Sequence, residues 1–233
     1  MPSLEEPIIP SLEEPILSRD ALTDRVYARL RAQITNLRLE PGRRLNIDQL
    51  SRELRVSATP IREALNRLAS ERLVQTEPFR GFRVERLLHR DEIRDLFDAR
   101  AVIEIGAIST SVERLGTDDH DQLAALVEEM QTIAGANDFD FVAYNAADEI
   151  FHRIIVAGSG NSFLLQAWEG LKVHAQIARN FKGTSSTDAT LAHAEHCQIL
   201  AALVAGDVDA ARIHATRHIH CVFSRLNDSG GLQ

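Results

Sequence analysis

The chain of 233 residues is poor in cysteine and aromatic residues and lacks any long apolar run. Its two cysteines, Cys197 and Cys221, are too few for a disulfide framework, so we expect reduced thiols in a cytoplasmic protein. No stretch reaches the roughly 18 apolar residues of a membrane span. The first residues are acids and prolines instead of a basic and then apolar signal, so secretion is not expected. Aromatic residues amount to only 5% of the chain, whereas alanine, leucine and arginine are abundant and favour helix.

Charge is distributed unevenly along the chain. The net charge of −8 averages two unlike halves. Residues 19–88 contain no lysine, 15 arginines and 9 acidic residues, for a net charge of +6, whereas residues 89–233 contain 11 basic and 21 acidic residues, for −10. This asymmetry predicts that only the first half meets a polyanion such as DNA. A basic face that is merely solvated is the alternative.

The order of segments predicts a flexible tail and a small DNA-binding domain. Residues 1–18 contain two copies of Ser-Leu-Glu-Glu-Pro-Ile, whose prolines and glutamates are typical of an extended tail. Apolar spacing then predicts three helices, from Ala21 to before Pro41-Gly42, over 47–55 and over 59–71. Two short alternating segments, 73–77 and 82–86, predict strands joined by a hairpin tip at Pro78–Gly81. Residues 19–86 are therefore predicted to form a winged helix-turn-helix, followed by a linker at 87–90.

Strand signals disappear in the second half. Residues 91–228 are predicted to form an all-helical bundle of about six helices, so the fold class is mainly α. Each break between helices contains glycine and a capping residue, as helix ends require. The predicted helices cover 91–115, 119–135, 138–157, 161–182, 188–205 and 208–227.

Several residues of the first domain are candidates for DNA contacts. Ser57, Thr59 and Arg62 lie at the start of the predicted recognition helix, where backbone amides and arginine can bind phosphate or guanine. Arg80 and Gly81 at the wing tip are placed for the minor groove. The remaining arginines of the predicted surface, which suit backbone contacts, are Arg43, Arg44, Arg52 and Arg67. The alternative is that the arginines among them are merely surface residues of a small helical domain.

The first domain resembles the GntR family of bacterial transcription regulators. The resemblance rests on two ordered motifs, Pro41-Gly42-x-x-Leu45 and Ser57-x-Thr59-Pro60-Ile61-Arg62-Glu63-Ala64-Leu65-x-Arg67-Leu68. Two positions depart from the family pattern. Ala58 stands where arginine is common, and Arg72 stands where glycine is usual before the first wing strand. The missing arginine removes one base or phosphate contact, which affects the operator sequence more than DNA binding itself.

The helical half contains candidate metal ligands. Asn145, Asp148 and His152 share one helical face, and a carboxylate and an imidazole four residues apart can reach one ion. His196 and His218, on separate helices, could complete the site. Spacing alone leaves alternatives open, because a histidine is more often a core or surface residue than a ligand. The competing residues are His193, His214, His220 and Cys221.

This half resembles the FCD effector domain of the FadR subfamily, so that the two resemblances together cover about residues 20–227. In family order, the shared motifs are Arg100-Ala101-Val102-Ile103-Glu104, Asp148-x-x-Phe151-His152, Gly158-Ser159-Gly160-Asn161, Glu195-His196, Gly206-Asp207-x-x-x-Ala211 and His218-Ile219. The resemblance implies that one divalent metal ion is held by Asp148, His152, His196 and His218. Such a donor set suits zinc, and also nickel, manganese or iron.

Open positions on the metal would suit the carboxylate of a small organic acid. Arg100 could clamp this effector and Asn145 could donate a hydrogen bond to it. The alternative role of Arg100 is an ion pair with Glu104, four residues along the same helix.

The leading interpretation is a ligand-responsive transcription regulator. It would bind an inverted-repeat operator as a homodimer, with an organic acid beside the metal altering the arrangement of the DNA-binding domains. The rival is a metal-dependent hydrolase built on Asp148, His152, His196 and His218, with Glu149 as base. In that reading, however, Asp148 replaces the first histidine of the zinc-protease pattern. A helical scaffold that uses the winged domain for protein contacts is a third possibility, with no motif behind it.

Overall fold

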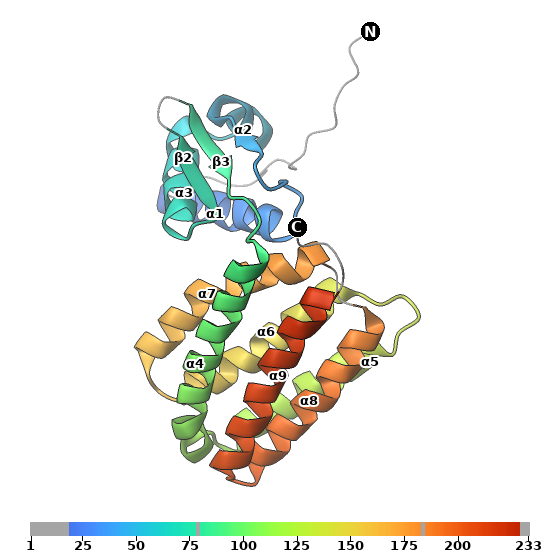
Figure 1. Ribbon diagram of the computed structural model, residues 1–233. Helices are drawn as coiled ribbons and strands as arrows, with labels where there is room; N and C mark the ends of the chain where they lie inside the picture. The colour runs from blue at the N-terminus through green and yellow to red at the C-terminus, as the bar shows by residue number, and fades with distance from the viewer. Residues whose placement is uncertain (1–18, 78–79, 183–184, 229–233) are drawn as a thin grey trace. The chain divides into compact units, whose positions relative to one another are not determined.

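The computed structural model describes residues 19–77, 80–182 and 185–228, and the chain divides between Leu87 and Leu88 into two compact units (Figure 1). The predicted tail at 1–18 and part of the predicted hairpin tip, Pro78 and Phe79, lie outside the described residues. Both units are mainly α-helical, which confirms the predicted fold class. None of the helices in the described ranges combines the length and hydropathy that a membrane span requires.

The N-terminal unit is a winged helix-turn-helix, as predicted. Apolar residues spaced three and four apart make a common core, in which Leu30, Ile61 and Leu65 are fully buried. The strand β3 pairs antiparallel with both β1 and β2, which gives the sheet order β1-β3-β2. The elements are α1 (Arg19–Thr35), β1 (Arg44–Leu45), α2 (Ile47–Leu54), α3 (Ala58–Ser70), β2 (Val74–Glu77) and β3 (Gly81–Val84).

Two local features of this unit differ from the sequence prediction. The first helix ends at Thr35, because Leu37 adopts a left-handed φ of 57°, and Leu39 enters the core in its place with 2% exposure. The strand β1 was not predicted, since two residues are too few to show an alternating pattern. It exists because Leu45 pairs with Phe82 and the preceding turn is tied to the wing, where the Gly42 amide donates to the Val84 carbonyl.

The turn between α3 and β2 contains strain that can be relieved. Arg72 is exposed and has a φ of 57°, a region that costs a residue with a Cβ about 1–2 kcal/mol. We expect Arg72→Gly to raise the free energy of unfolding by about 0.5–1 kcal/mol, after allowing for the greater freedom of glycine in the unfolded chain. Urea denaturation measures this change. Arg72→Ala keeps the strain and is the control; equal stabilisation by alanine would contradict the explanation.

The C-terminal unit is an all-helical bundle. Within residues 88–228 as described, α4 packs against α6, α7 and α9, while α8 packs against α5 and α9 (Figure 1). The predicted linker at 87–90 overlaps the first helix, because His89 caps α4 and Arg90 is its first residue. The helices are α4 (Arg90–Arg114), α5 (Thr117–Ala134), α6 (Phe141–Gly158), α7 (Ser162–Lys182), α8 (Ser186–Val204) and α9 (Val208–Asp228).

The Gly158–Asn161 motif forms the tight turn between α6 and α7. Gly160 has a φ of +69°, and a Cβ added to it would lie 2.6 Å from the Arg114 guanidinium. Asn161 then starts α7, because its side-chain oxygen accepts hydrogen bonds from the amides of Phe163 and Leu164. The motif therefore has a structural role, which directs α7 back along the bundle.

Candidate metal centre and DNA-binding surface

Three helices bring the four predicted metal ligands together. Asp140 caps the start of α6 by accepting from two backbone amides, which sets the helical register that places Asp148 and His152 one turn apart. The Tyr144 hydroxyl donates to the Ala189 carbonyl and so ties α6 to α8. His196 comes from α8 and His218 from α9.

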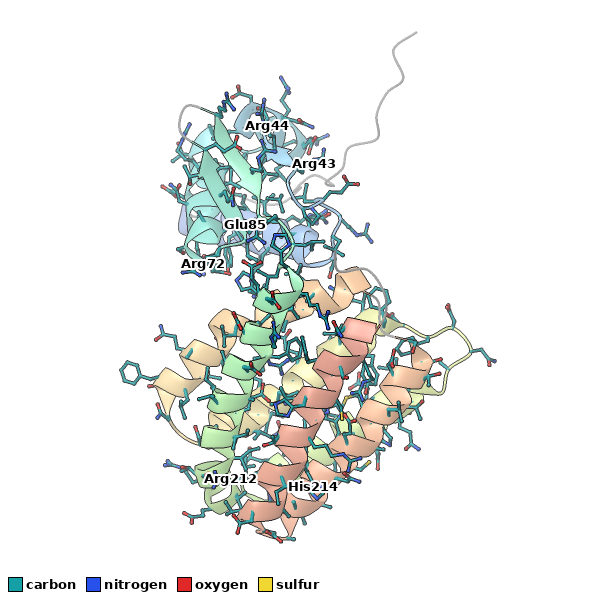
Figure 2. The ribbon with its side chains drawn as sticks, in the orientation of Figure 1. Arg43, Arg44, Arg72, Glu85, Arg212 and His214 are labelled. Carbon is teal, nitrogen blue, oxygen red and sulfur yellow. The ribbon has the colours of Figure 1, made fainter. Side chains whose placement is uncertain are left out.

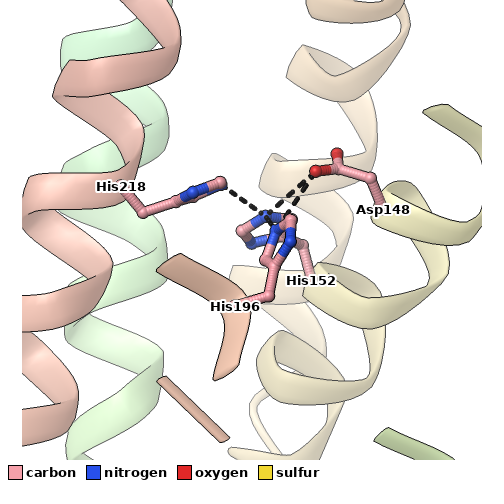
Figure 3. A group of neighbouring side chains, drawn as sticks. All are labelled: Asp148, His152, His196 and His218. Atoms are coloured by element: carbon pink, nitrogen blue, oxygen red, sulfur yellow. Dashed lines mark hydrogen bonds and ion pairs between the residues drawn. The ribbon is translucent and has the colours of Figure 1, made fainter. Parts of the chain in front are cut away.

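The four side chains are buried and converge on one point (Figure 3). The His152 Nε2 lies 3.2 Å from the His218 Nε2 and 3.4 Å from the His196 Nε2. The Asp148 Oδ1 lies 3.2 Å from the His196 Nε2 and 3.8 Å from the His152 Nε2. All four atoms are within 4.8 Å of one another. A zinc ion bound tetrahedrally separates its ligand atoms by about 3.3 Å, so the donor set and its spacing fit such an ion.

Two buried carboxylates orient the imidazoles from behind. The Glu104 Oε2 lies 2.8 Å from the His152 Nδ1, and the Glu195 Oε2 lies 2.8 Å from the His218 Nδ1. A carboxylate at Nδ1 keeps the proton there and leaves the Nε2 lone pair facing the centre. Glu104 also accepts from the Trp168 indole at 2.7 Å, and Arg225 binds Glu195 with two nitrogens at 2.8 and 3.0 Å.

The electrostatics keep the carboxylates of Glu104 and Glu195 charged and the imidazole of His218 neutral. Burial opposes ionisation of Glu104, but Arg100 and His152 outweigh it and hold the pKa of Glu104 well below its usual range. Burial likewise opposes ionisation of Glu195, yet the hydrogen bonds from Arg225 and His218 lower its pKa to about 2. Burial and the nearby His196 lower the pKa of His218 to about 3. At neutral pH the His218 ring therefore has the unprotonated nitrogen that a metal ligand needs.

A small cavity, partly open to solvent, adjoins the cluster on the side of Asp148. Both predicted effector residues line it, because Arg100 and Asn145 face it from α4 and α6. Arg100 also makes the alternative contact, with its Nε and Nη2 at 3.0 and 2.8 Å from the Glu104 Oε1. The Asn145 amide donates to the Asn180 Oδ1 at 3.3 Å. The ion pair thus fixes Arg100 at the wall of the cavity.

Sequence reasoning missed part of this site. Lys172 and Gln176, one turn apart on α7, line the same cavity. A signal existed for Lys172, since it is one of only two lysines in an arginine-rich chain. The competing ligands lie elsewhere: within the described residues, the cluster of potential ligands includes none of His193, His214, His220 and Cys221.

The start of α3 presents the predicted DNA-reading residues to solvent. Ser57 caps the helix through its backbone conformation without a side-chain hydrogen bond, so its hydroxyl is available to a ligand. Thr59 and Arg62 are exposed on the first turns, and in the described part of the chain Arg62 has no ion-pair partner. Ala58 is exposed between Ser57 and Thr59, where the family commonly has arginine.

The other predicted DNA residues have mixed environments. Arg52 and Arg80 are exposed, and Gly81 beside Arg80 has a φ of +89°. Arg43 and Arg44 lie before α2, at the opposite end of the unit from Arg72 (Figure 2). Arg67 differs, since it pairs with Asp24 of α1 at 2.7 Å and lies over the Tyr27 ring at 3.9 Å. Within the unit, Arg67 therefore ties α3 to α1.

The chain joins a winged helix-turn-helix to a helical bundle that holds a buried polar site. This combination defines a transcription regulator with a DNA-binding unit and a regulatory unit. Comparison with known proteins agrees. Residues 22–84 match the model of the bacterial regulatory proteins of the gntR family, and residues 95–220 match the FCD domain. The chain therefore belongs to the GntR family, with a C-terminal FCD domain.

Three relatives illustrate the likeness. The Nta operon transcriptional regulator of Aminobacter aminovorans is 30% identical over 80% of this chain and 85% of its own length. The gluconate operon transcriptional repressor of Bacillus licheniformis is 33% identical over 67% of this chain and 63% of its own. The solved structure of E. coli McbR/YncC has the same fold, with a TM-score of 0.78 and 24% identity over 93% of this chain and all of its own.

These matches identify a DNA-binding transcription regulator and not an enzyme. The rival hydrolase also finds no support in the position of Glu149, its assigned base. The Glu149 Oε1 is 2.7 Å from the Lys172 Nζ, in an ion pair between α6 and α7.

Proposed function

We propose that this regulator responds to a small organic acid. In the proposal, a homodimer binds an inverted-repeat operator, and the acid binds beside a divalent metal ion, preferably zinc, in the helical domain. Occupation of this site changes DNA affinity through a coupling free energy between two distinct sites. The observation that carries the proposal is the convergence of Asp148, His152, His196 and His218 next to a cavity lined by Arg100 and Asn145.

The chemistry of the residues supports this assignment. When bound, the metal would be a Lewis acid, and a carboxylate oxygen would join the four protein ligands by expanding the coordination number beyond four. Arg100 and Asn145 would orient the rest of the ligand, and burial of the cluster would exclude competing water. One relative is named as the repressor of a gluconate operon, and gluconate is a carboxylic acid.

The DNA-binding half of the proposal rests on α3 and the wing. Ser57, Thr59 and Arg62 would meet base edges or phosphates in the major groove, and Arg80 with Gly81 would meet the minor groove. Arg43, Arg44 and Arg52 would bind the DNA backbone. A homodimer would place two such modules on the two halves of an inverted repeat.

One experiment tests the response to an organic acid and its dependence on metal. A duplex selected from a random library by the full-length protein is labelled, and its affinity is measured by fluorescence anisotropy with a panel of small organic acids. We expect at least one acid to change the Kd about tenfold, within the usual range of allosteric coupling. Chelation should abolish this effect and added zinc should restore it. An effect that survives chelation, or no effect from any acid, would contradict the proposal.

A further inference from the structure

The cavity beside Asp148 contains an ion pair that the proposed function leaves without a role. The Lys172 Nζ on α7 lies 2.7 Å from the Glu149 Oε1 on α6, and both side chains line the cavity. They are largely withdrawn from solvent, with 17% and 28% of the side chains exposed. The Lys172 Nζ also lies 5.6 Å from the centre of the Trp168 ring.

Glu149 places a second carboxylate in the cavity. It follows Asp148 in the sequence, so its side chain leaves α6 about 100° further around the helix. Asp148 consequently reaches the histidine cluster, while Glu149 reaches α7. The lining of the cavity thus contains a potential metal ligand, Asp148, and a second carboxylate, Glu149, that is paired with Lys172.

The cations of the cavity are already engaged. Among the described residues that line it, the cations are Arg100 and Lys172. Arg100 is bound to Glu104 and Lys172 is bound to Glu149. A bound divalent ion would keep one net positive charge after coordination by Asp148 and three neutral imidazoles, and one carboxylate of an effector would neutralise it. A second carboxylate would lie against Glu149 or would have to displace it from Lys172.

We propose that Glu149 is a specificity-determining residue that restricts the effector to small acids with a single carboxylate. This inference rests on the proposed function. Like charges a few ångströms apart repel strongly in a partly buried site, and such repulsion is how a pocket rejects a near-identical competitor. The amides of Asn145 and Gln176 add hydrogen-bonding groups for a hydroxyl.

Trp168 provides a direct readout of ligand binding. It is the single tryptophan of the chain, it is 1% exposed, and it contacts both Glu104 and Lys172. Its fluorescence is followed while zinc-loaded, full-length protein is titrated with 2-hydroxybutyrate or malate. These two acids differ only in that a second carboxylate of malate replaces a methyl group.

We expect wild-type protein to bind 2-hydroxybutyrate at least about tenfold more tightly than malate. Glu149→Gln keeps the size of the side chain and frees Lys172 for a second carboxylate, so malate affinity should rise at least about tenfold. Glu169→Gln is the matched control, because it removes the Arg153–Glu169 pair, an exposed ion pair of 3.0 Å between the same two helices. It should leave the ratio of the two affinities unchanged.

The outcomes separate this inference from the function on which it rests. An unchanged ratio in Glu149→Gln, or a preference of wild-type protein for malate, overturns the role of Glu149 while acid binding itself stands. If zinc-loaded wild-type protein binds neither acid, the inference is overturned as well. The zinc content and the response of DNA binding to the acid panel then decide independently whether the proposed function fails.

Discussion

Protein carrying His196→Ala or His218→Ala should contain almost no divalent metal after purification. Each change would remove one of the four proposed ligands from a buried site, and the remaining three would not enclose the ion in the same way. Elemental analysis measures the metal content. Chelator should lower the unfolding temperature of wild-type protein by about 5 °C or more, since a ligand present at 100 times its Kd stabilises the folded state by about 2.7 kcal/mol. In both variants, chelator should have little effect.

His193→Ala is the control for this experiment. His193 lies on the same helix as His196 and is partly buried, but its Nε2 is 3.5 Å from the Cys197 Sγ and outside the cluster. The His193→Ala variant should retain full metal content and the response to chelator. The differential effect of chelator distinguishes lost metal from the packing defect that removal of a buried ring also causes. Full metal content in both cluster variants would refute the assigned ligands.

Arg62→Ala should weaken specific DNA binding by about 1–3 kcal/mol, which corresponds to a loss of about 5- to 150-fold in affinity. Arg62 is exposed on the second turn of α3, and its guanidinium makes no ion pair in the described part of the chain. Folding therefore does not depend on it. Anisotropy titrations with the selected duplex and with a scrambled duplex measure the change.

The pattern of loss identifies the contact. If Arg62 reads a base, the selected duplex loses affinity and the scrambled one does not; if it binds phosphate, both weaken and the salt dependence falls by about one ion. Arg72→Gly removes the same charge from the same unit but beyond the other end of α3, and it should leave the affinity nearly unchanged. Unaltered binding of the selected duplex by Arg62→Ala would rule out its role.

Local patterns predicted the secondary structure well. The helices from α2 to α9 begin and end within about three residues of the predicted bounds, because apolar spacing and capping groups act over one or two turns. The end of α1 was predicted poorly, because Leu37 fits the helical spacing while Leu39 fills the core. The strand β1 depends on Phe82, 37 residues after Leu45, so no neighbouring residue indicates it.

The candidate site was predicted unequally. Asp148 and His152 share a helical face that spacing alone reveals, whereas His196 and His218 were selected from other histidines by family resemblance. The structure brings all four together, and their role as ligands stays a prediction. Spacing could not indicate Trp168 or Lys172 as neighbours of the site, since both come from α7, which contributes none of the four residues. Arg225 follows His218 by two turns on the same face of α9, so spacing could have indicated it.

The sequence by itself determined the order of elements, the winged domain with the exposed start of α3, and the separation of basic and acidic halves. Those properties follow from periodicity, caps and composition, which are local. Only the tertiary structure decided which helices meet, and therefore which carboxylate faces which imidazole. It placed Glu104 behind His152, Glu195 behind His218 and Glu149 against Lys172, because close packing of long helices fixes contacts that no short segment contains.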